Sequence, residues 1–280
     1  MIAAALLHPD VSTGKVDRFR SSGAELQIQD DLEHCVNFSA ALIFGGDGTV
    51  HRHLLQLHRQ NIPVLVVPAG SGNDFAKSLG IRSVDIALTA WKQFCADGKN
   101  VREIDLGVIR ASGEEIFFCC VAGVGMDAEA NARANRMPQW LKSRGGYILA
   151  ALRSLIAFQP ADMSITTAQR EIRRPAFFIA VGNAHRYGGG MKVTPQATPD
   201  DGLLDICVVG KMNKLKLLCW VPTIFFGGHL ALKQVEYFQA EQVRINTSRE
   251  LELFADGDFA CHTPVEISVV PRALRVIVPV

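Results

Sequence analysis

Short apolar runs alternate with helix-like segments over the first third of the chain. Residues 3–7, 40–44 and 63–67 are such runs, and residues 50–60 form a helix-like segment. This alternation is typical of parallel strands joined by crossover helices. We therefore predict an α/β domain over residues 1–97, whose ligands would gather at the C-terminal ends of its strands.

The pattern becomes strand-rich after residue 101. Turn signals such as Ser112-Gly113, Asp200-Asp201-Gly202 and Asp256-Gly257 separate the apolar runs, as in a sandwich or barrel. We place a second domain at 98–280, with helical inserts at 128–158 and 211–232 and with residues 271–280 packing back on the first domain. The predicted strands are 103–109, 115–121, 175–181, 203–209, 251–254 and 265–270.

Composition narrows the classes of partner and compartment. The 29 Lys and Arg nearly balance the 28 Asp and Glu, so no overall field favours nucleic acid. The N-terminus lacks a basic leader, and the apolar stretch 217–232 falls short of the roughly 20 residues that span a bilayer. The seven cysteines have neither disulfide-framework nor zinc-site spacing, which favours a reducing cytosol. They are Cys35, Cys95, Cys119, Cys120, Cys207, Cys219 and Cys261.

A glycine-rich turn follows the apolar run 40–44. It contains Gly45, Gly46, Asp47, Gly48 and Thr49. Its glycines would let a phosphate approach the backbone, and its carboxylate could hold the accompanying cation. The alternative is an ordinary glycine turn in which the aspartate only caps the following helix.

A second glycine-rich turn follows the next apolar run. It contains Gly70, Ser71, Gly72, Asn73 and Asp74, and the turn lacks the third glycine of a dinucleotide fingerprint. A Walker A loop is absent as well. Because both turns follow consecutive strands, we expect them to form one shared site.

The order of the motifs along the whole chain resembles the diacylglycerol kinase catalytic-domain family, which includes bacterial lipid kinases and sphingosine kinases and is more distantly related to NAD kinases. The resemblance rests on GGDGT at 45–49 and PAGSGNDFA at 68–76, followed by Asp105-Leu106-Gly107, Gly123-Val124-Gly125-Met126-Asp127, Asn183, Gly188-Gly189-Gly190, Pro195 with Ala197, Asp201-Gly202-Leu203-Leu204-Asp205, Gly228-His229 and Asp256-Gly257-Asp258.

This resemblance implies a fold and an activity. The expected fold is an N-terminal Rossmann-like, three-layer α/β nucleotide-binding domain followed by a C-terminal β-sandwich-like domain. The expected activity is ATP-dependent transfer of a phosphoryl group to the hydroxyl of a lipid such as diacylglycerol, a reaction that depends mainly on positioning and charge neutralisation.

The resemblance also implies residue roles. Both glycine turns, with His8 and Asp256, would bind the nucleotide. Carboxylates would organise Mg²⁺ through water, and a second, structural cation site would use Asp201 and Leu203. A plain turn is the alternative there, as it is at Asp105. Catalysis would involve Asp47 and Asp258. The expected Mg²⁺ carboxylates are Asp47, Asp74 and Asp105.

Three positions depart from the family pattern. His8 stands at the end of the opening strand, where the family has an asparagine, and could donate one hydrogen bond in its place. Asp258 stands where the family has its presumed general base, a glutamate, so the shorter side chain must reach the lipid hydroxyl by backbone adjustment or through water. Cys120 replaces an asparagine near the nucleotide. The departure at Asp258 leaves a catalytically silent nucleotide- or lipid-binding relative open. An NAD kinase-like enzyme stays open because NAD kinases share the GGDGT turn, and a sphingosine kinase-like enzyme stays open within the same family.

Two segments mix basic and apolar residues. One is 133–153, and the other places Lys211, Lys214 and Lys216 before the apolar stretch 217–232. Such mixtures suit an anionic membrane surface, although solvated helix faces over a core stripe look the same. We expect a cytoplasmic protein with transient, peripheral contact to the inner membrane face, where its lipid substrate lies; an exposed strand edge leaves a homodimer open.

Overall fold

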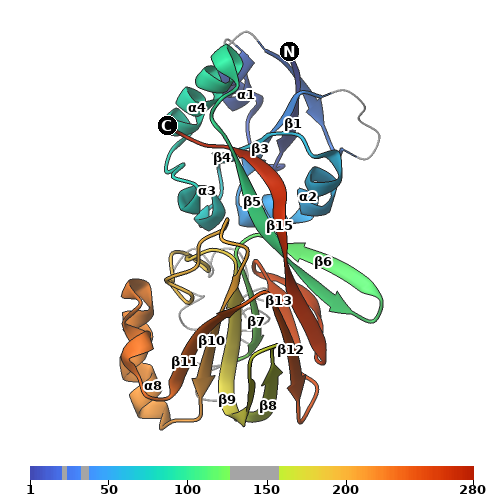
Figure 1. Cartoon of the computed structure of the whole chain (residues 1–280). Coiled ribbons are helices and arrows are strands. Elements are labelled where there is room, and N and C mark those ends of the chain that lie inside the picture. Colours follow the sequence, from blue (N-terminus) through green and yellow to red (C-terminus); the bar gives the residue numbers. More distant parts are fainter. Residues whose placement is uncertain (21–23, 33–37, 127–157) are drawn as a thin grey trace. The chain divides into compact units, whose positions relative to one another are not determined.

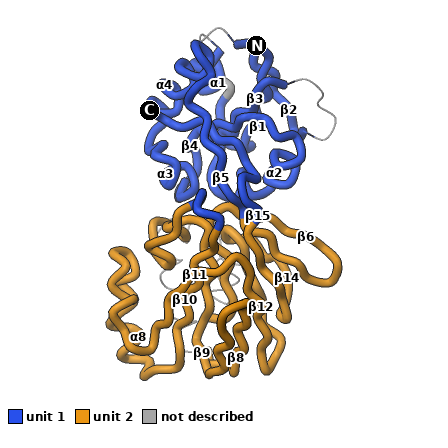
Figure 2. Tube along the Cα trace, in the orientation of Figure 1, with its two compact units in different colours: residues 1–106, 199–202, 270–280 blue, residues 107–198, 203–269 orange. Residues whose placement is uncertain are grey.

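The computed structural model describes residues 1–20, 24–32, 38–126 and 158–280, which form two compact units (Figures 1 and 2). Unit 1 contains Met1–Leu106, Pro199–Gly202 and Val270–Val280; unit 2 contains Gly107–Thr198 and Leu203–Val269. Unit 1 thus extends beyond the boundary that the sequence placed at 97/98, because strand β5 (Val101–Ala111) begins in unit 1 and ends in unit 2. Strand β15 (Val265–Ile277) returns the chain to unit 1.

Unit 1 is a parallel sheet with helices on both faces. Its strands lie in the order β2-β1-β3-β4-β15, and Figure 1 places α1 and α4 on one side and α2 on the other. The three apolar runs of the sequence form β1, β3 and β4, and residues 3–6 and 40–44 are fully buried. The elements are β1 (Ile2–Leu7), α1 (Thr13–Arg20), β2 (Glu25–Gln29), β3 (Ala40–Gly45), α2 (Asp47–Gln60), β4 (Val64–Pro68), α3 (Asp74–Ser78) and α4 (Val84–Asp97).

Unit 2 is built from antiparallel strands. They pair in the order β14-β13-β7-β9-β8-β12-β15, and β10 pairs with β9 and β11. The predicted turn at Ser112-Gly113 joins β5 to β6; both residues have positive φ, as a two-residue hairpin turn requires. The strands are β6 (Glu114–Phe118), β7 (Val121–Gly125), β8 (Ala161–Thr166), β9 (Glu171–Gly182), β10 (Leu204–Gly210), β11 (Val235–Ala240), β12 (Gln242–Thr247), β13 (Glu252–Ala255) and β14 (Asp258–His262).

One of the two predicted helical inserts is described. The insert at 211–232 consists of α8 (Lys214–Trp220), η2 (Val221–Phe226) and η3 (Gly228–Ala231). The other falls, apart from Phe158, outside the described residues, as does the basic and apolar segment 133–153. In the described ranges, no helix is both long and apolar enough to cross a membrane.

Candidate active site

The two glycine turns lie backbone to backbone at the C-terminal ends of β3 and β4. Gly45 is in register with Pro68, and the Ala69 N–H donates to the Gly45 carbonyl at 2.9 Å. A Cβ added to Gly70 would lie 2.6 Å from the Cα of Gly46, so a side chain cannot fit there without moving backbone. The turns predicted to share one site therefore do meet, and glycine at position 70 makes the meeting possible.

Asp47 connects the two turns. It lies in the first turn of α2, and its carboxylate accepts the backbone N–H groups of Asp74 at 3.1 Å and Phe75 at 3.0 Å, where α3 begins. A Cβ on Gly72 would lie 2.9 Å from the Asp47 Oδ2 atom. Because each carboxylate oxygen accepts one of these two N–H groups, the bonds fix the orientation of the side chain. Asp47 thus holds the second turn in place, a structural role that the sequence did not reveal.

The second turn is also shaped by its own side chains. Asn73 has a left-handed φ of 53°, and its amide accepts from the Gly70 N–H at 2.9 Å and donates to the Gly70 carbonyl at 2.7 Å. Lys77 donates to the Gly72 carbonyl at 2.7 Å, which brings a cation to the turn. Ser71 is exposed and Asp74 is buried. Sequence reasoning missed Lys77; its place one helical turn after Asp74 was the available signal.

His8 follows β1 at the same edge of the sheet. Its backbone N–H donates to the Phe44 carbonyl at 2.9 Å, next to the first glycine turn. Its Nδ1 atom lies 3.2 Å from the Asp10 N–H, which donates to it. The structure therefore places His8 beside the turn, with one ring nitrogen committed to its own loop.

Asp105 joins the three segments of unit 1. Its buried carboxylate accepts the backbone N–H groups of Gly202 at 2.7 Å and Arg272 at 2.8 Å, and its own N–H donates to the Pro199 carbonyl at 2.7 Å. This geometry gives Asp105 a structural role, and its contact with Mg²⁺ stays a prediction. The predicted cation site at Asp201, which is exposed, and Leu203 also stays a prediction.

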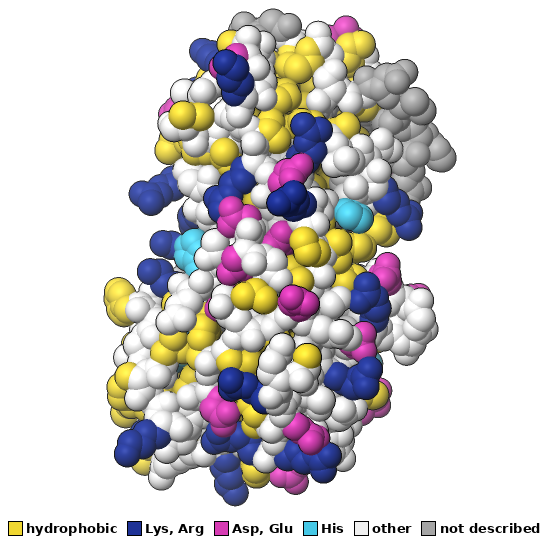
Figure 3. All heavy atoms as spheres, in the orientation of Figure 1, with side chains coloured by type: hydrophobic (Ala, Val, Ile, Leu, Met, Phe, Trp, Pro, Cys, Tyr) yellow, Lys and Arg dark blue, Asp and Glu magenta, His cyan; other side chains and the backbone are white. Residues whose placement is uncertain are grey.

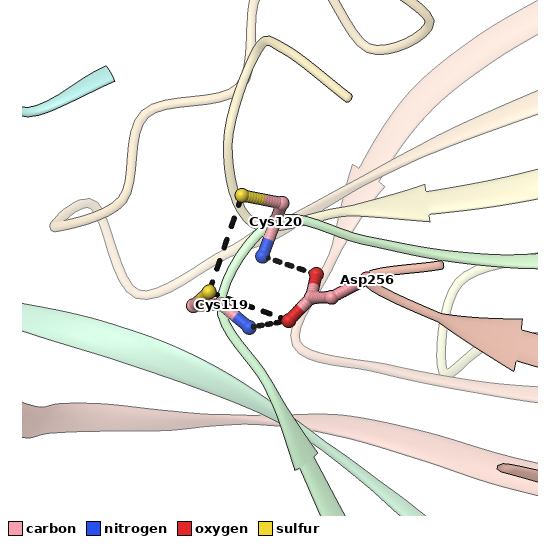
Figure 4. A group of neighbouring side chains, drawn as sticks. All are labelled: Cys119, Cys120 and Asp256. Carbon is pink, nitrogen blue, oxygen red and sulfur yellow. Dashed lines mark hydrogen bonds between the residues drawn. The ribbon is translucent and has the colours of Figure 1, made fainter. Parts of the chain in front are cut away.

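In unit 2, the Asp256 carboxylate sits in a nest of backbone N–H groups (Figure 4). It accepts from Cys119 at 2.8 Å, Cys120 at 2.8 Å and Val121 at 3.1 Å, and from the Cys119 thiol at 3.3 Å. The two sulfurs lie 4.0 Å apart, so these three residues form a compact group of potential metal ligands. Because the carboxylate already accepts three N–H groups, it anchors the turn between β6 and β7. Its predicted contact with a nucleotide is untested.

The same carboxylate supports the hairpin that presents Asp258. Asp256 and Gly257 have φ values of 51° and 99°, which form the two-residue turn between β13 and β14. Asp258 is exposed and pairs with Ala255 at the start of β14. The Asp256 carboxylate thus ties this turn to the turn between β6 and β7, while Asp258 is exposed to solvent.

Asn183 supports the β6–β7 turn from the other side. It is fully buried, its amide donates to the Cys119 carbonyl at 3.1 Å, and its N–H donates to the Cys120 carbonyl at 2.8 Å. The loop that follows contains Gly188, Gly189 and Gly190, all with positive φ. The sequence expected this loop to approach a substrate; the structure shows a backbone shape that favours glycine.

Two family models match successive parts of the chain. Residues 14–109 match the diacylglycerol kinase catalytic domain, and residues 120–278 match the YegS C-terminal NAD kinase beta sandwich-like domain. A diacylglycerol kinase of Mycobacterium tuberculosis (strain CDC 1551 / Oshkosh) is 37% identical over 248 residues, which cover 86% of this chain and 77% of the relative. The chain belongs to the diacylglycerol kinase family of lipid kinases. The resemblance inferred from its motifs is therefore confirmed.

Other relatives agree with this family and its fold. The putative lipid kinase YtlR of Bacillus subtilis (strain 168) is 28% identical over 244 residues, which cover 84% of this chain and 79% of the relative. A putative diacylglycerol kinase from Bacillus anthracis str. Sterne superposes with a TM-score of 0.79 at 20% identity, covering 99% of this chain and 97% of that one. An NAD kinase from Archaeoglobus fulgidus, solved with ATP, has a TM-score of 0.59 at 13% identity, covering 100% of this chain and 94% of that one. The predicted fold class is confirmed.

Proposed function

We propose that the protein transfers the γ-phosphoryl group of Mg-ATP to the free hydroxyl of diacylglycerol and so forms phosphatidic acid. The observation that supports this proposal is the close backbone approach of Gly46 and Gly70 in a member of the lipid kinase family. Asp47, next to Gly46, is held there because its carboxylate accepts two backbone N–H groups of the second turn. Bound Mg-ATP would supply the phosphoryl group and the charge neutralisation that its transfer requires.

The first turn and its neighbour fit the phosphates of a nucleotide. Because Gly46 and Gly70 carry no side chains, the two turns lie against each other, and a phosphate bound there would meet the backbone of both turns. Gly48 and Ser71 are exposed, and Lys77 brings a positive charge to the second turn. Phosphates favour this combination of backbone N–H groups, a hydroxyl and a cation.

The carboxylates of unit 1 fit Mg²⁺, which prefers oxygen ligands. Asp47 is half-buried and fixed by its two backbone hydrogen bonds, and Asp74 lies buried at the start of α3. Asp105 uses both carboxylate oxygens for backbone N–H groups, so we expect it to contact the cation only through water. These residues would hold the ion that accompanies the nucleotide.

Asp258 is the proposed acceptor of the lipid hydroxyl proton. It is exposed at the start of β14, where the nest around Asp256 fixes the preceding turn. Since phosphoryl transfer passes through a loose transition state in most analyses, a base that mainly orients the hydroxyl can work despite the shorter side chain of aspartate. The same substitution is the reason to keep a non-catalytic nucleotide- or lipid-binding relative as the second candidate.

The test is transfer of label from γ-labelled ATP to dioctanoylglycerol, sphingosine and NAD in parallel reactions with Mg²⁺. We expect label in phosphatidic acid, little in the other two products, and none after chelation of the metal. Labelling of NAD or sphingosine instead would show that the acceptor is not diacylglycerol and would assign the labelled compound as the substrate. ATP binding without label in any acceptor would overturn the kinase proposal and favour the non-catalytic relative.

A further inference from the structure

The helical segment after β10 presents an apolar stripe to the outside of unit 2. Leu215 and Leu218 of α8 are 72% and 40% exposed, and Phe225 and Phe226 at the end of η2 are 42% and 84% exposed. We call these four residues the apolar ridge. α8 buries only Leu217 and η2 buries none of its residues. Figure 3 shows apolar side chains along the edge of unit 2 where α8 lies in Figure 1. A monomeric protein in water rarely keeps such side chains together without a partner.

The spacing of the ridge makes it one continuous face. The C-cap of α8, Val221, has helical φ and ψ angles, so η2 continues the helical run. Leu215, Leu218, the exposed Pro222 and Phe225 follow one another at intervals of three or four residues. Such intervals place side chains on the same side of a helix. Leu215, Leu218 and Phe225 therefore share one side of the helical run, and Phe226, the residue after Phe225, extends the ridge at its end.

The ridge lies in a cationic segment. Residues 211–235 contain no Asp or Glu and four lysines, Lys211, Lys214, Lys216 and Lys233. Lys216 of α8 donates to the Gln234 side chain at 3.1 Å. Gln234 directly follows Lys233, so this hydrogen bond holds the Lys233 segment beside α8. Apolar side chains combined with lysines are typical of helices that lie in the interface of an anionic bilayer.

The back of this segment is fixed to unit 2. The Lys192 N–H donates to the Ile224 carbonyl of η2 at 3.0 Å, and a Cβ on Gly227 would lie 3.1 Å from Pro195. The hydrogen bond attaches the segment to the loop that follows Gly188–Gly190, and Gly227 lies close to Pro195 of the same loop. A surface bound by the ridge would therefore lie near the Gly188–Gly190 loop, which the family resemblance predicts to approach the substrate.

We propose that the apolar ridge and its lysines form the surface by which this protein docks on a bilayer containing anionic lipid. The inference deepens the proposed lipid kinase function and rests on it for its biological purpose. A second copy of the chain fits this surface less well, because a two-fold pairing through the ridge would bring the lysines of both copies together.

The test is flotation of the full chain, without nucleotide, with vesicles of phosphatidylcholine alone or of phosphatidylcholine and phosphatidylglycerol. We expect binding to the anionic vesicles, a loss of about tenfold in affinity for Phe226→Ser and for Leu215→Ser, and a loss of roughly fivefold for Lys211→Gln. Ile28→Ser is the matched apolar control, since Ile28 is 45% exposed on β2 of unit 1, and Lys92→Gln on α4 is the charge control. Neither control should change binding.

Phosphorylation of soluble dioctanoylglycerol, measured on the same variants, separates this proposal from the proposed function. Unchanged activity together with weakened vesicle binding supports the docking surface. Vesicle binding that is the same for wild type, Phe226→Ser and Leu215→Ser overturns it, even if the kinase activity is found. A dimer that these variants dissociate, with vesicle binding intact, would assign the ridge to a second copy. Absence of activity in all variants with the predicted binding pattern would leave docking in place and remove the kinase function.

Discussion

Asp256 and Asp258 are two residues apart in one hairpin, but the structure predicts very different effects on stability when each is substituted. Asp256 is buried and accepts three backbone N–H groups, whereas Asp258 is exposed. In Asp256→Asn, an amide oxygen can still accept from Cys120 and Val121. The amide nitrogen would then face the Cys119 N–H, which lies 2.8 Å from the carboxylate oxygen that it replaces. One charge-assisted hydrogen bond is lost and two donors oppose each other.

We expect this substitution to destabilise the protein by about 2–4 kcal/mol. For a domain of this size the loss corresponds to a fall in Tm of roughly 5–15 °C. Asp258→Asn should change the free energy of unfolding by less than about 0.5 kcal/mol, as exposed substitutions usually do. The matched pair differs in burial and bonding, and hardly in position along the chain.

Urea unfolding followed by circular dichroism measures both values under the same conditions. Kinase activity measured on the folded variants separates their roles, because Asp256→Asn would act through the shape of the turn and Asp258→Asn through the chemistry. Equal stabilities for the two variants would show that the nest contributes little to the fold. The assignment of Asp256 as the anchor of the hairpin would then be wrong.

Two further predictions concern the folded state of each unit. Gly70→Ala should destabilise the protein by about 1–3 kcal/mol because the new Cβ would meet the backbone of Gly46. Gly14→Ala is the control: a Cβ there has nothing within 4 Å and should stabilise α1 by up to about 1 kcal/mol. Similar urea midpoints for the two variants would refute the close approach of the turns. Burial lowers the pKa of His229 below its usual 6.5, so below that pH the unfolded state takes up a proton that folded His229 resists. Stability should therefore fall as the pH drops from 7 to 5, by up to about 1.4 kcal/mol per pH unit, and His229→Gln, unlike the exposed His262→Gln, should remove that part of the slope.

The sequence predicts the elements whose side chains are uniformly apolar. The runs at 3–7, 40–44 and 63–67 became β1, β3 and β4 because central parallel strands are buried on both faces. By contrast, β2 (Glu25–Gln29) was missed, since its alternation of polar and apolar residues at the sheet edge gives only a weak signal over five positions. Strand β12, which pairs with β8 and β15, was also missed, and it too alternates polar and apolar residues over a short run. Strand β11, which pairs with β10, was missed as well.

The site divides in a similar way. The glycine turns were found because glycine spacing is local and the ends of neighbouring strands must meet. The partners of Asp47, Asp105 and Asp256 were not predictable, because each carboxylate accepts backbone N–H groups from segments distant in the chain. Backbone donors carry no sequence signature, so these structural roles appear only in the fold.

The measurement that tests the central claim most directly is phosphorylation of dioctanoylglycerol by wild type, Asp258→Asn and Asp258→Glu, with ATP binding measured on the same samples. We predict that all three bind ATP alike, that Asp258→Asn lowers kcat by at least about a hundredfold, and that Asp258→Glu retains or raises it. Full activity in Asp258→Asn, or ATP binding by a wild type that labels no lipid, would contradict the account.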